Sequence, residues 1–209
     1  MGAGLRAEEE SESVMLYFAG VDPDLHSLHT AVIVCNDEGT MSALSGIWTV
    51  KAKGAKNEEA VVQILRFPFG CPLKAQAVAI ESQQVTYTGR TNAARPQDLI
   101  HLAQVAGGLV GLWRDTPNVY LPVPQAWKGS VPKHIKQARV FSALGIKYAL
   151  AGGNCQYAVP ENFKQYDKTG NLNAGDWIDA GDSVGLALYA AERYFKEARI
   201  KNSLKNNLK

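Results

Sequence analysis

The chain has 209 residues and a mass of 22.6 kDa, which is enough for one substantial domain with a well-buried core. With 46% hydrophobic and 20% charged residues it is an average globular protein, and disordered, collagen-like and coiled-coil classes are excluded. The net charge of +2 is nearly neutral, yet residues 193–209 carry six basic side chains and one glutamate, whereas residues 1–13 carry four glutamates and one arginine. We predict a disordered acidic segment over 1–13, one domain over 14–196 and a basic tail over 197–209, which is either a phosphate contact or a solvated helix end.

Cysteine usage and hydropathy indicate the compartment. Cys35, Cys71 and Cys155 are odd in number and contain no CxxC pair, which favours a reducing environment. The acidic N-terminal stretch is unlike a secretory signal, and no apolar run approaches the roughly 18 residues that a membrane helix needs. We therefore expect a cytoplasmic protein with no membrane partner.

The first half of the chain is expected to be mostly strands. Three apolar, β-branched runs over 14–22, 29–35 and 45–50 predict an antiparallel meander. A helical pattern then begins at Asn57 and is broken by Pro68 and Pro72, and a fourth strand is expected over 75–80.

The second half is expected to be mostly helical. The predicted elements are, in order, a helix over 96–113, a strand over 118–123, a helix from a Ser130 cap to about 144, a loop over 152–175 and a long helix over about 176–196. The large aromatic side chains Trp48, Trp113 and Trp177 are assigned to core or interface packing. The resulting order is βββαβαβαα with no internal repeat.

Acidic residues stand where two predicted strands end and where the last helix begins. Asp22 and Glu81 end strands, which is where ligands usually bind in open sheets, and Asp179 and Asp182 share one face of the helix. Each has a structural alternative, because Asp-Pro is good turn chemistry and an Asp near a helix N-terminus, including Asp176, interacts favourably with the helix dipole. Together, however, this many hard oxygen donors favour a site for two Mg²⁺ or Mn²⁺ ions.

Three short motifs in this order resemble the RuvC-type Holliday junction resolvases of the ribonuclease H-like superfamily. The resemblance covers residues 15–195, and its variable stretches at 85–95 and 152–175 are similar to those of phage-encoded members. It implies an α/β, ribonuclease H-like fold, with a five-stranded mixed sheet flanked by helices and a catalytic, metal-binding tetrad. The motifs are Ala-Gly-Val-Asp22, Ala-Ile-Glu81-Ser-Gln-Gln-Val and Ile-Asp179-Ala-Gly-Asp182-Ser-Val-Gly-Leu-Ala, and the implied tetrad is Asp22, Glu81, Asp179 and Asp182.

The resemblance also implies an activity. It predicts a crossover junction endodeoxyribonuclease of recombination and repair, in a bacterial or phage-infected cell, that resolves four-way DNA junctions with symmetric nicks. Two Mg²⁺ or Mn²⁺ ions per active site would carry out phosphodiester hydrolysis, one activating water and the other stabilising the leaving oxygen. Symmetric cutting of a two-fold junction asks for two sites, so we expect a homodimer, with the helix over 96–113 as its interface element.

Basic residues after the fifth predicted strand are candidates for contacts with DNA. Four cations lie beside a tryptophan between a strand end and a helix start, which suits a phosphate track, although a solvated helix face is the alternative. They are Lys128, Lys133, Lys136 and Arg139. In the stretch after Glu81, Tyr87 is the candidate junction wedge and Arg90 and Arg95 are candidate contacts to the junction arms, or incidental residues of a surface loop.

Four alternatives remain beside this hypothesis. A zinc site at His26 and His29 has no further ligands to complete a tetrahedron, and an actin-like ATPase predicts phosphate loops and a second meander that this sequence lacks. A non-catalytic junction-binding domain is favoured by a lost acid, and all four are present. A nuclease of the same fold that acts on flaps, forks or RNA–DNA hybrids is the nearest rival.

Overall fold

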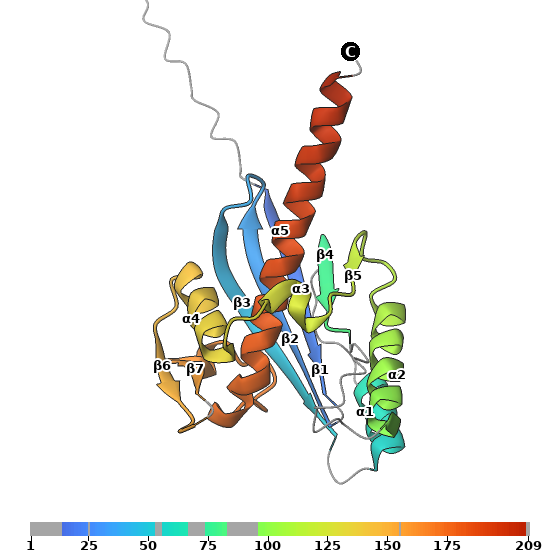
Figure 1. Ribbon diagram of the computed structural model, residues 1–209, viewed down its shortest axis with the longest axis vertical. Coiled ribbons are helices and arrows are strands. Elements are labelled where there is room, and N and C mark those ends of the chain that lie inside the picture. Colours follow the sequence, from blue (N-terminus) through green and yellow to red (C-terminus); the bar gives the residue numbers. More distant parts are fainter. Residues whose placement is uncertain are drawn as a thin grey trace, which may run out of the picture.

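Five strands form the central sheet of the protein, in the order β3-β2-β1-β4-β5 (Figure 1). The computed structural model describes residues 14–24, 26–52, 56–66, 74–82, 96–154 and 156–207. The antiparallel meander is β1 (Met15–Pro23), β2 (Ser27–Asn36) and β3 (Met41–Lys51), while β4 (Ala77–Ile80) and β5 (Val119–Tyr120) add parallel pairings on the other side of β1. β1 is therefore central, with a neighbour on each edge.

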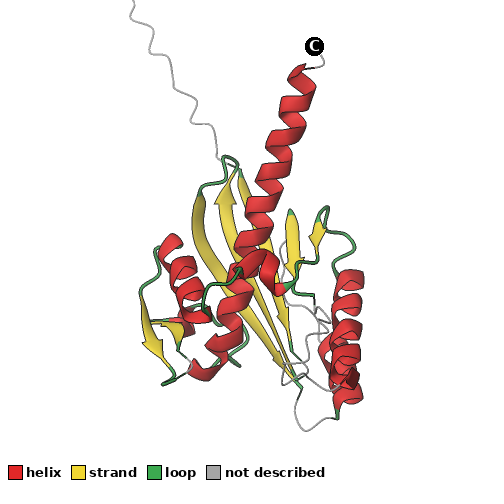
Figure 2. Ribbon diagram, in the orientation of Figure 1, coloured by secondary structure: helices red, strands yellow, loops and turns green. Residues whose placement is uncertain are grey.

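Successive side chains of a strand point to opposite faces, and both faces of this sheet are covered by helices. On one face, α1 (Asn57–Arg66) and α2 (Pro96–Leu112) pack on an apolar cluster that includes Val21 and Ile80. On the other face lies α5 (Trp177–Asn207), which packs on a cluster that includes Phe18 and Ala79 (Figure 2).

A small layer from the second half of the chain covers the first turns of α5. It contains α3 (Pro124–Lys128), α4 (Lys133–Ala143), the antiparallel hairpin of β6 (Tyr148–Ala151) and β7 (Tyr157–Pro160), and two 3₁₀ turns, Phe163–Gln165 and Ala174–Asp176. Trp177 anchors this layer, because its fully buried ring lies edge-on to Phe141 of α4 and to Phe163. The layer thereby holds the N-terminal end of α5 in place.

Gly20 on β1 sets how closely α5 approaches the sheet. A Cβ atom at this position would lie 2.1 Å from both the backbone nitrogen of Ala187 and the carbonyl oxygen of Ser183. Only glycine leaves room for this approach of strand and helix backbones. Because Gly20 is two residues before Asp22 and Ser183 directly follows Asp182, the contact brings the strand carboxylate and the helix carboxylate together.

The predicted fold class is confirmed, and the largest differences in the elements lie in the second half of the chain. The loop expected over 152–175 contains β7 and both 3₁₀ turns, and α3 was not predicted. The helix expected from Ser130 begins at Lys133 with Pro132 as its N-cap, so a Ser130 cap is wrong. The last helix runs on to Asn207 through most of the basic segment, where it extends beyond the sheet (Figure 1).

The predicted packing of the tryptophans is confirmed: Trp113 and Trp177 are buried, and Trp48 packs against the α1–α2 side of the core. Cys35 is a buried free thiol, and Cys71 and Cys155 lie outside the described residues. Among the described helices, none is both long enough and apolar enough to cross a membrane.

Candidate active site

Asp22 and Glu81 lie side by side at the end of two parallel strands. β1 and β4 pair in register up to Val21 and Ile80, and the Glu81 amide donates to the Val21 carbonyl at 2.9 Å. Both acids follow the alternation of their strands onto the face that α5 covers. The interpretation of Asp22 as a turn residue is wrong, because β1 continues through Pro23.

Asp179 and Asp182 come from the first turns of α5. Asp182 is buried, with 3% exposure, and Asp179 is partly exposed. Asp176 does not join them: its carboxylate accepts the Asn173 amide in a capping box and pairs with Lys51, with an N–O distance of 2.7 Å. Asp176 therefore has the structural role that was its alternative interpretation.

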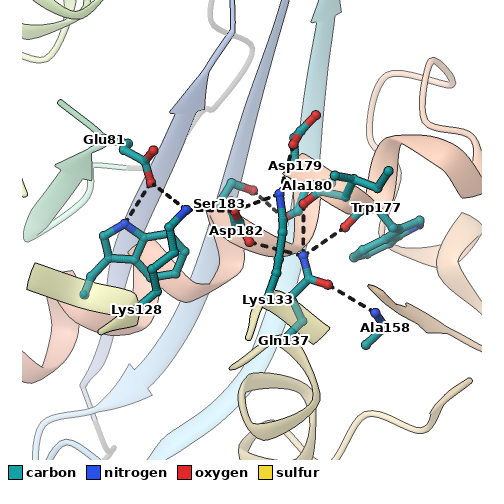
Figure 3. Close-up of polar contacts among 12 residues, drawn as sticks. Glu81, Lys128, Lys133, Gln137, Ala158, Trp177, Asp179, Ala180, Asp182 and Ser183 are labelled. Carbon is teal, nitrogen blue, oxygen red and sulfur yellow. Dashed lines mark hydrogen bonds and ion pairs between the residues drawn. The ribbon is translucent and has the colours of Figure 1, made fainter. Parts of the chain in front are cut away.

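Two lysines bridge the carboxylates (Figure 3). Lys128 Nζ lies 3.6 Å from Glu81 Oε2 and 3.3 Å from Asp182 Oδ2. Lys133 Nζ lies 3.1 Å from Asp179 Oδ1 and 3.0 Å from Asp182 Oδ2. Two of the lysines predicted to contact DNA, Lys128 and Lys133, thus form ion pairs within the cluster of acids. Both of them contact the same oxygen, Asp182 Oδ2.

Trp127 and Gln137 hold two of these carboxylates through neutral donors. Trp127 Nε1 donates to Glu81 Oε2 at 2.8 Å, and Gln137 Nε2 donates to Asp182 Oδ1 at 3.1 Å. Both side chains are buried, and both fit against glycines of α5, because a Cβ at Gly185 would collide with the Trp127 ring and one at Gly181 with the Gln137 amide. The two glycines of α5 therefore leave room for Trp127, which donates to Glu81, and for Gln137, which donates to Asp182.

The four acids influence one another electrostatically. Burial raises the pKa of Asp22 well above its ordinary value, and the charges of Glu81, Asp182 and Asp179 raise it further. Burial also raises the pKa of Glu81, although Lys128 and the Trp127 hydrogen bond work in the opposite direction. The pKa of Lys133 is raised despite its burial, because Asp182 and Asp179 stabilise the ammonium group.

The oxygen donors of the four acids bear on whether the site fits divalent cations. In the part of the chain that the structure describes, no group of three or more His, Cys, Asp or Glu side chains is arranged so that it could hold a metal ion as it stands. Glu81, Asp179 and Asp182 instead contact ammonium groups. Four carboxylates nevertheless outnumber two lysines, and all donors are the hard oxygens that Mg²⁺ and Mn²⁺ prefer, so the chemistry of the residues fits these ions.

The remaining predicted residues lie apart from this group or outside the description. Lys136 and Arg139 are on α4, half-buried and exposed, respectively. His29 is buried, with its Nδ1 3.1 Å from Thr49 Oγ1, and His26 is exposed, so the two do not form a zinc pair. Tyr87, Arg90 and Arg95 lie outside the described residues.

Comparison with solved structures places this geometry in a known fold. The chain aligns with the RuvC protein of T. thermophilus, solved in complex with a Holliday junction substrate, with a TM-score of 0.53 and 19% identity. The fold is RuvC-like. The alignment covers 88% of this chain and 96% of the RuvC chain. Neither a scan against models of protein families nor a search of curated proteins gives a match.

Sequence reasoning missed the role of the two orienting residues in this RuvC-like fold. The sequence shows Trp127 only as an aromatic residue among cations, and its pattern does not single out Gln137. One signal for Gln137 was present: it follows Lys133 by four residues, so the two share a face of α4. Trp127 carried no comparable signal, because its bond to Glu81 joins residues far apart in the sequence.

Proposed function

We propose that this protein is a metal-dependent DNA endonuclease that resolves four-way junctions by hydrolysing phosphodiester bonds. The observation that carries the proposal is the convergence of Asp22, Glu81, Asp179 and Asp182 from two strand ends and one helix, in a RuvC-like fold. The solved neighbour is bound to a Holliday junction, which supports branched DNA as the substrate.

In this proposal the four carboxylates would hold two Mg²⁺ or Mn²⁺ ions. When bound, such ions stabilise the charge that develops on the attacking and leaving oxygens of a phosphodiester. Trp127 and Gln137 keep Glu81 and Asp182 oriented toward the centre of the site through their N–H donors. Buried carboxylates that repel one another have a strong affinity for divalent cations, since the cations remove that repulsion.

Lys128 and Lys133 have a second task in this proposal. Each ammonium group neutralises two carboxylates in the structure, and each retains a part of its surface exposed to solvent. If the four carboxylates held divalent cations, the same ammonium groups would be available to bind the phosphate backbone. Lys136 and Arg139 on α4 would extend this contact along a DNA arm.

A homodimer would supply the two sites that symmetric cutting requires. α2 is the proposed interface element, because it packs on the sheet through Val105 and Leu109 but exposes Ile100 and Leu112, at 59% and 49%. Sedimentation of the purified protein at micromolar concentration tests this part: a dimer is expected, and a monomer would remove α2 from this role.

The activity is tested with a labelled synthetic four-way junction in Mg²⁺ or Mn²⁺, beside linear duplex, flap, fork and RNA–DNA hybrid controls and an EDTA blank. Paired, symmetric, metal-dependent nicks in the junction are expected. Cutting of flaps, forks or hybrids in preference to the junction would assign the neighbouring nuclease classes instead. Binding of the junction with no cutting of any substrate would favour the non-catalytic alternative.

A pair of aspartate variants tests the site. Asp182→Asn should abolish cleavage while junction binding persists, because it removes the carboxylate shared by both lysines. Asp176→Asn is the matched control, since Asp176 caps a 3₁₀ turn and pairs with Lys51 outside the carboxylate group, and its loss should cost about 1 kcal/mol of stability with cleavage retained. If Asp182→Asn cleaved the junction as well as Asp176→Asn does, Asp182 would not be part of the catalytic site.

A further inference from the structure

Gln137 connects the β6–β7 hairpin to the candidate active site. Its side chain is 1% exposed and lies between α4, α5 and β7. Its Oε1 accepts the backbone amide of Ala158 on β7 at 3.1 Å. Its Nε2 donates to the Ile178 carbonyl at 3.0 Å and to Asp182 Oδ1 at 3.1 Å (Figure 3). One buried amide thus contacts the hairpin, the first turn of α5 and a candidate metal ligand.

The two oxygens of Asp182 have different partners. Oδ2 contacts Lys128 and Lys133, which are mobile ammonium groups on flexible side chains. Oδ1 accepts from Gln137, whose amide is fixed at both of its ends. Asp182 would therefore offer a divalent cation a carboxylate whose plane is already held through Oδ1.

We propose that Gln137 is a positioning residue that fixes the orientation of Asp182 for divalent cations and couples that orientation to the placement of the β6–β7 hairpin. This inference rests on the proposed function, because it takes Asp182 as a metal ligand. When a residue that orients a ligating carboxylate is removed, metal affinity typically falls by about 10- to 100-fold. A residue that only stabilised the fold would leave the affinity of the folded protein unchanged.

Gly181 provides an independent way to disturb the same amide. A Cβ at position 181 would lie 2.9 Å from Gln137 Nε2 and 3.0 Å from its Cδ, and no other group is as close. Gly181→Ala should therefore displace the Gln137 amide without deleting any hydrogen-bonding atom. Alanine is a better helix former than glycine, so this substitution does not lower the intrinsic stability of the helix. A loss of metal affinity in this variant could therefore not be explained by a weaker helix.

The test is Mn²⁺ binding to the full chain, measured by titration calorimetry and by the electron paramagnetic resonance of free Mn²⁺. Gln137→Met, which keeps length and removes the donors, should bind Mn²⁺ about 10- to 100-fold more weakly, and Gly181→Ala should weaken binding in the same direction. In the double variant the effects should not add, since both act through one amide. Gln104→Met, on the exposed side of α2, is the matched control and should bind as the wild type does.

Thermal unfolding without metal, run on the same variants, separates the outcomes. If Gln137→Met lowers the melting temperature but binds Mn²⁺ with wild-type affinity, Gln137 is structural and the inference is overturned while the proposed function stands. If the wild type itself binds no Mn²⁺, both the inference and the metal site of the proposed function are overturned. Additive losses in the double variant would show that Gly181 does not act through Gln137 and would overturn the assignment of both effects to one amide.

Discussion

The two faces of the central sheet are packed by different means. Toward α1 and α2, the sheet packs through buried aliphatic side chains such as Val21, Ile64 and Leu109. Toward α5, the sheet and the helix meet at Gly20 with their backbones in contact, and glycines of α5 admit Trp127 and Gln137. The first face stabilises the fold by burying apolar surface, whereas the second also fixes the positions of four carboxylates.

This difference predicts which substitutions affect the candidate site and which affect only the stability of the fold. A change of volume in either close-packed interface costs stability, but on the α5 face it must shift the backbones of β1 and α5, which carry three of the four carboxylates. We therefore expect changes on the α5 face to alter both stability and the site, and changes on the α1–α2 face to alter stability alone.

The largest effect is expected from glycine substitution on the α5 face. Gly20→Ala places a methyl group 2.1 Å from the main chain of α5, so the helix must shift away from β1, and we expect a loss of more than about 3 kcal/mol. At about 2–4 °C per kcal/mol, the melting temperature should fall by at least about 6 °C. Gly107→Ala on α2 meets nothing within 4 Å and should instead raise stability by roughly 0.5–1 kcal/mol. Equal shifts in thermal unfolding for the two variants would contradict the contrast between the faces.

A smaller effect is expected from tryptophan substitution, and it should fall on the site. Trp127→Phe keeps most of the ring but removes the N–H that donates to Glu81 Oε2, and because that bond lowers the pKa of Glu81, its loss should raise the pKa further. Mn²⁺ affinity should fall about 10- to 100-fold by titration calorimetry. Trp113→Phe, on the α1–α2 face, is the control and should leave the affinity unchanged; a matching loss there would assign the effect to general loosening of the core.

The next effect is a pH dependence caused by repulsion among the acids. Asp22 stays protonated to a higher pH in the folded protein than in the unfolded chain, so the folded state binds more protons in that interval and stability falls as pH rises through it. Asp22→Asn removes this destabilisation, so without metal the variant should melt higher than the wild type at about pH 7.5, with the gap closing toward about pH 3, below the ordinary pKa. Addition of Mg²⁺ should stabilise the wild type and not the variant. A gap that does not change with pH would argue against a buried, repelled carboxylate.

The smallest effect is expected on the C-terminal part of α5. Glu197 accepts hydrogen bonds from Arg193 at 2.9 Å and from Tyr120 at 3.2 Å, on an exposed surface. Glu197→Gln should change the free energy of unfolding by no more than about 0.5 kcal/mol and should leave Mn²⁺ affinity unchanged, since exposed pairs are screened by water. A larger loss in denaturant unfolding would mean that this part of the helix supports the site.

Much of the fold was predictable because its signals are local. The alternation and β-branched content of the meander, the apolar stripe of α2 and the two aspartates of α5 spaced three residues apart can all be recognised in short windows of sequence. One feature was not predictable in this way. The β6–β7 hairpin lies beside a stretch rich in Gly and Asn that resembles a loop, and it packs on α4, which is a contact between separate elements.

The acids of the site were predictable, but the groups that hold them were not. Asp22, Glu81, Asp179 and Asp182 stand at strand ends and on a helix face, positions that a pattern can indicate. The pairing of Lys128 with two acids, and the donors of Trp127 and Gln137, depend on contacts between segments that only the folded chain brings together. Gly20 shows the same limit, because its partner is a backbone far along the sequence.

The contact between Gly20 and Ser183 also has a consequence for synthesis of the protein. Asp22 and Glu81 are made early, whereas Asp179 and Asp182 are among the last residues of the domain to leave the ribosome. Contacts of such high sequence separation form late, since the intervening chain must be ordered first. A nascent chain that has not yet reached α5 therefore carries Asp22 and Glu81 without the two aspartates of the helix, so the four carboxylates come together only after α5 has been made.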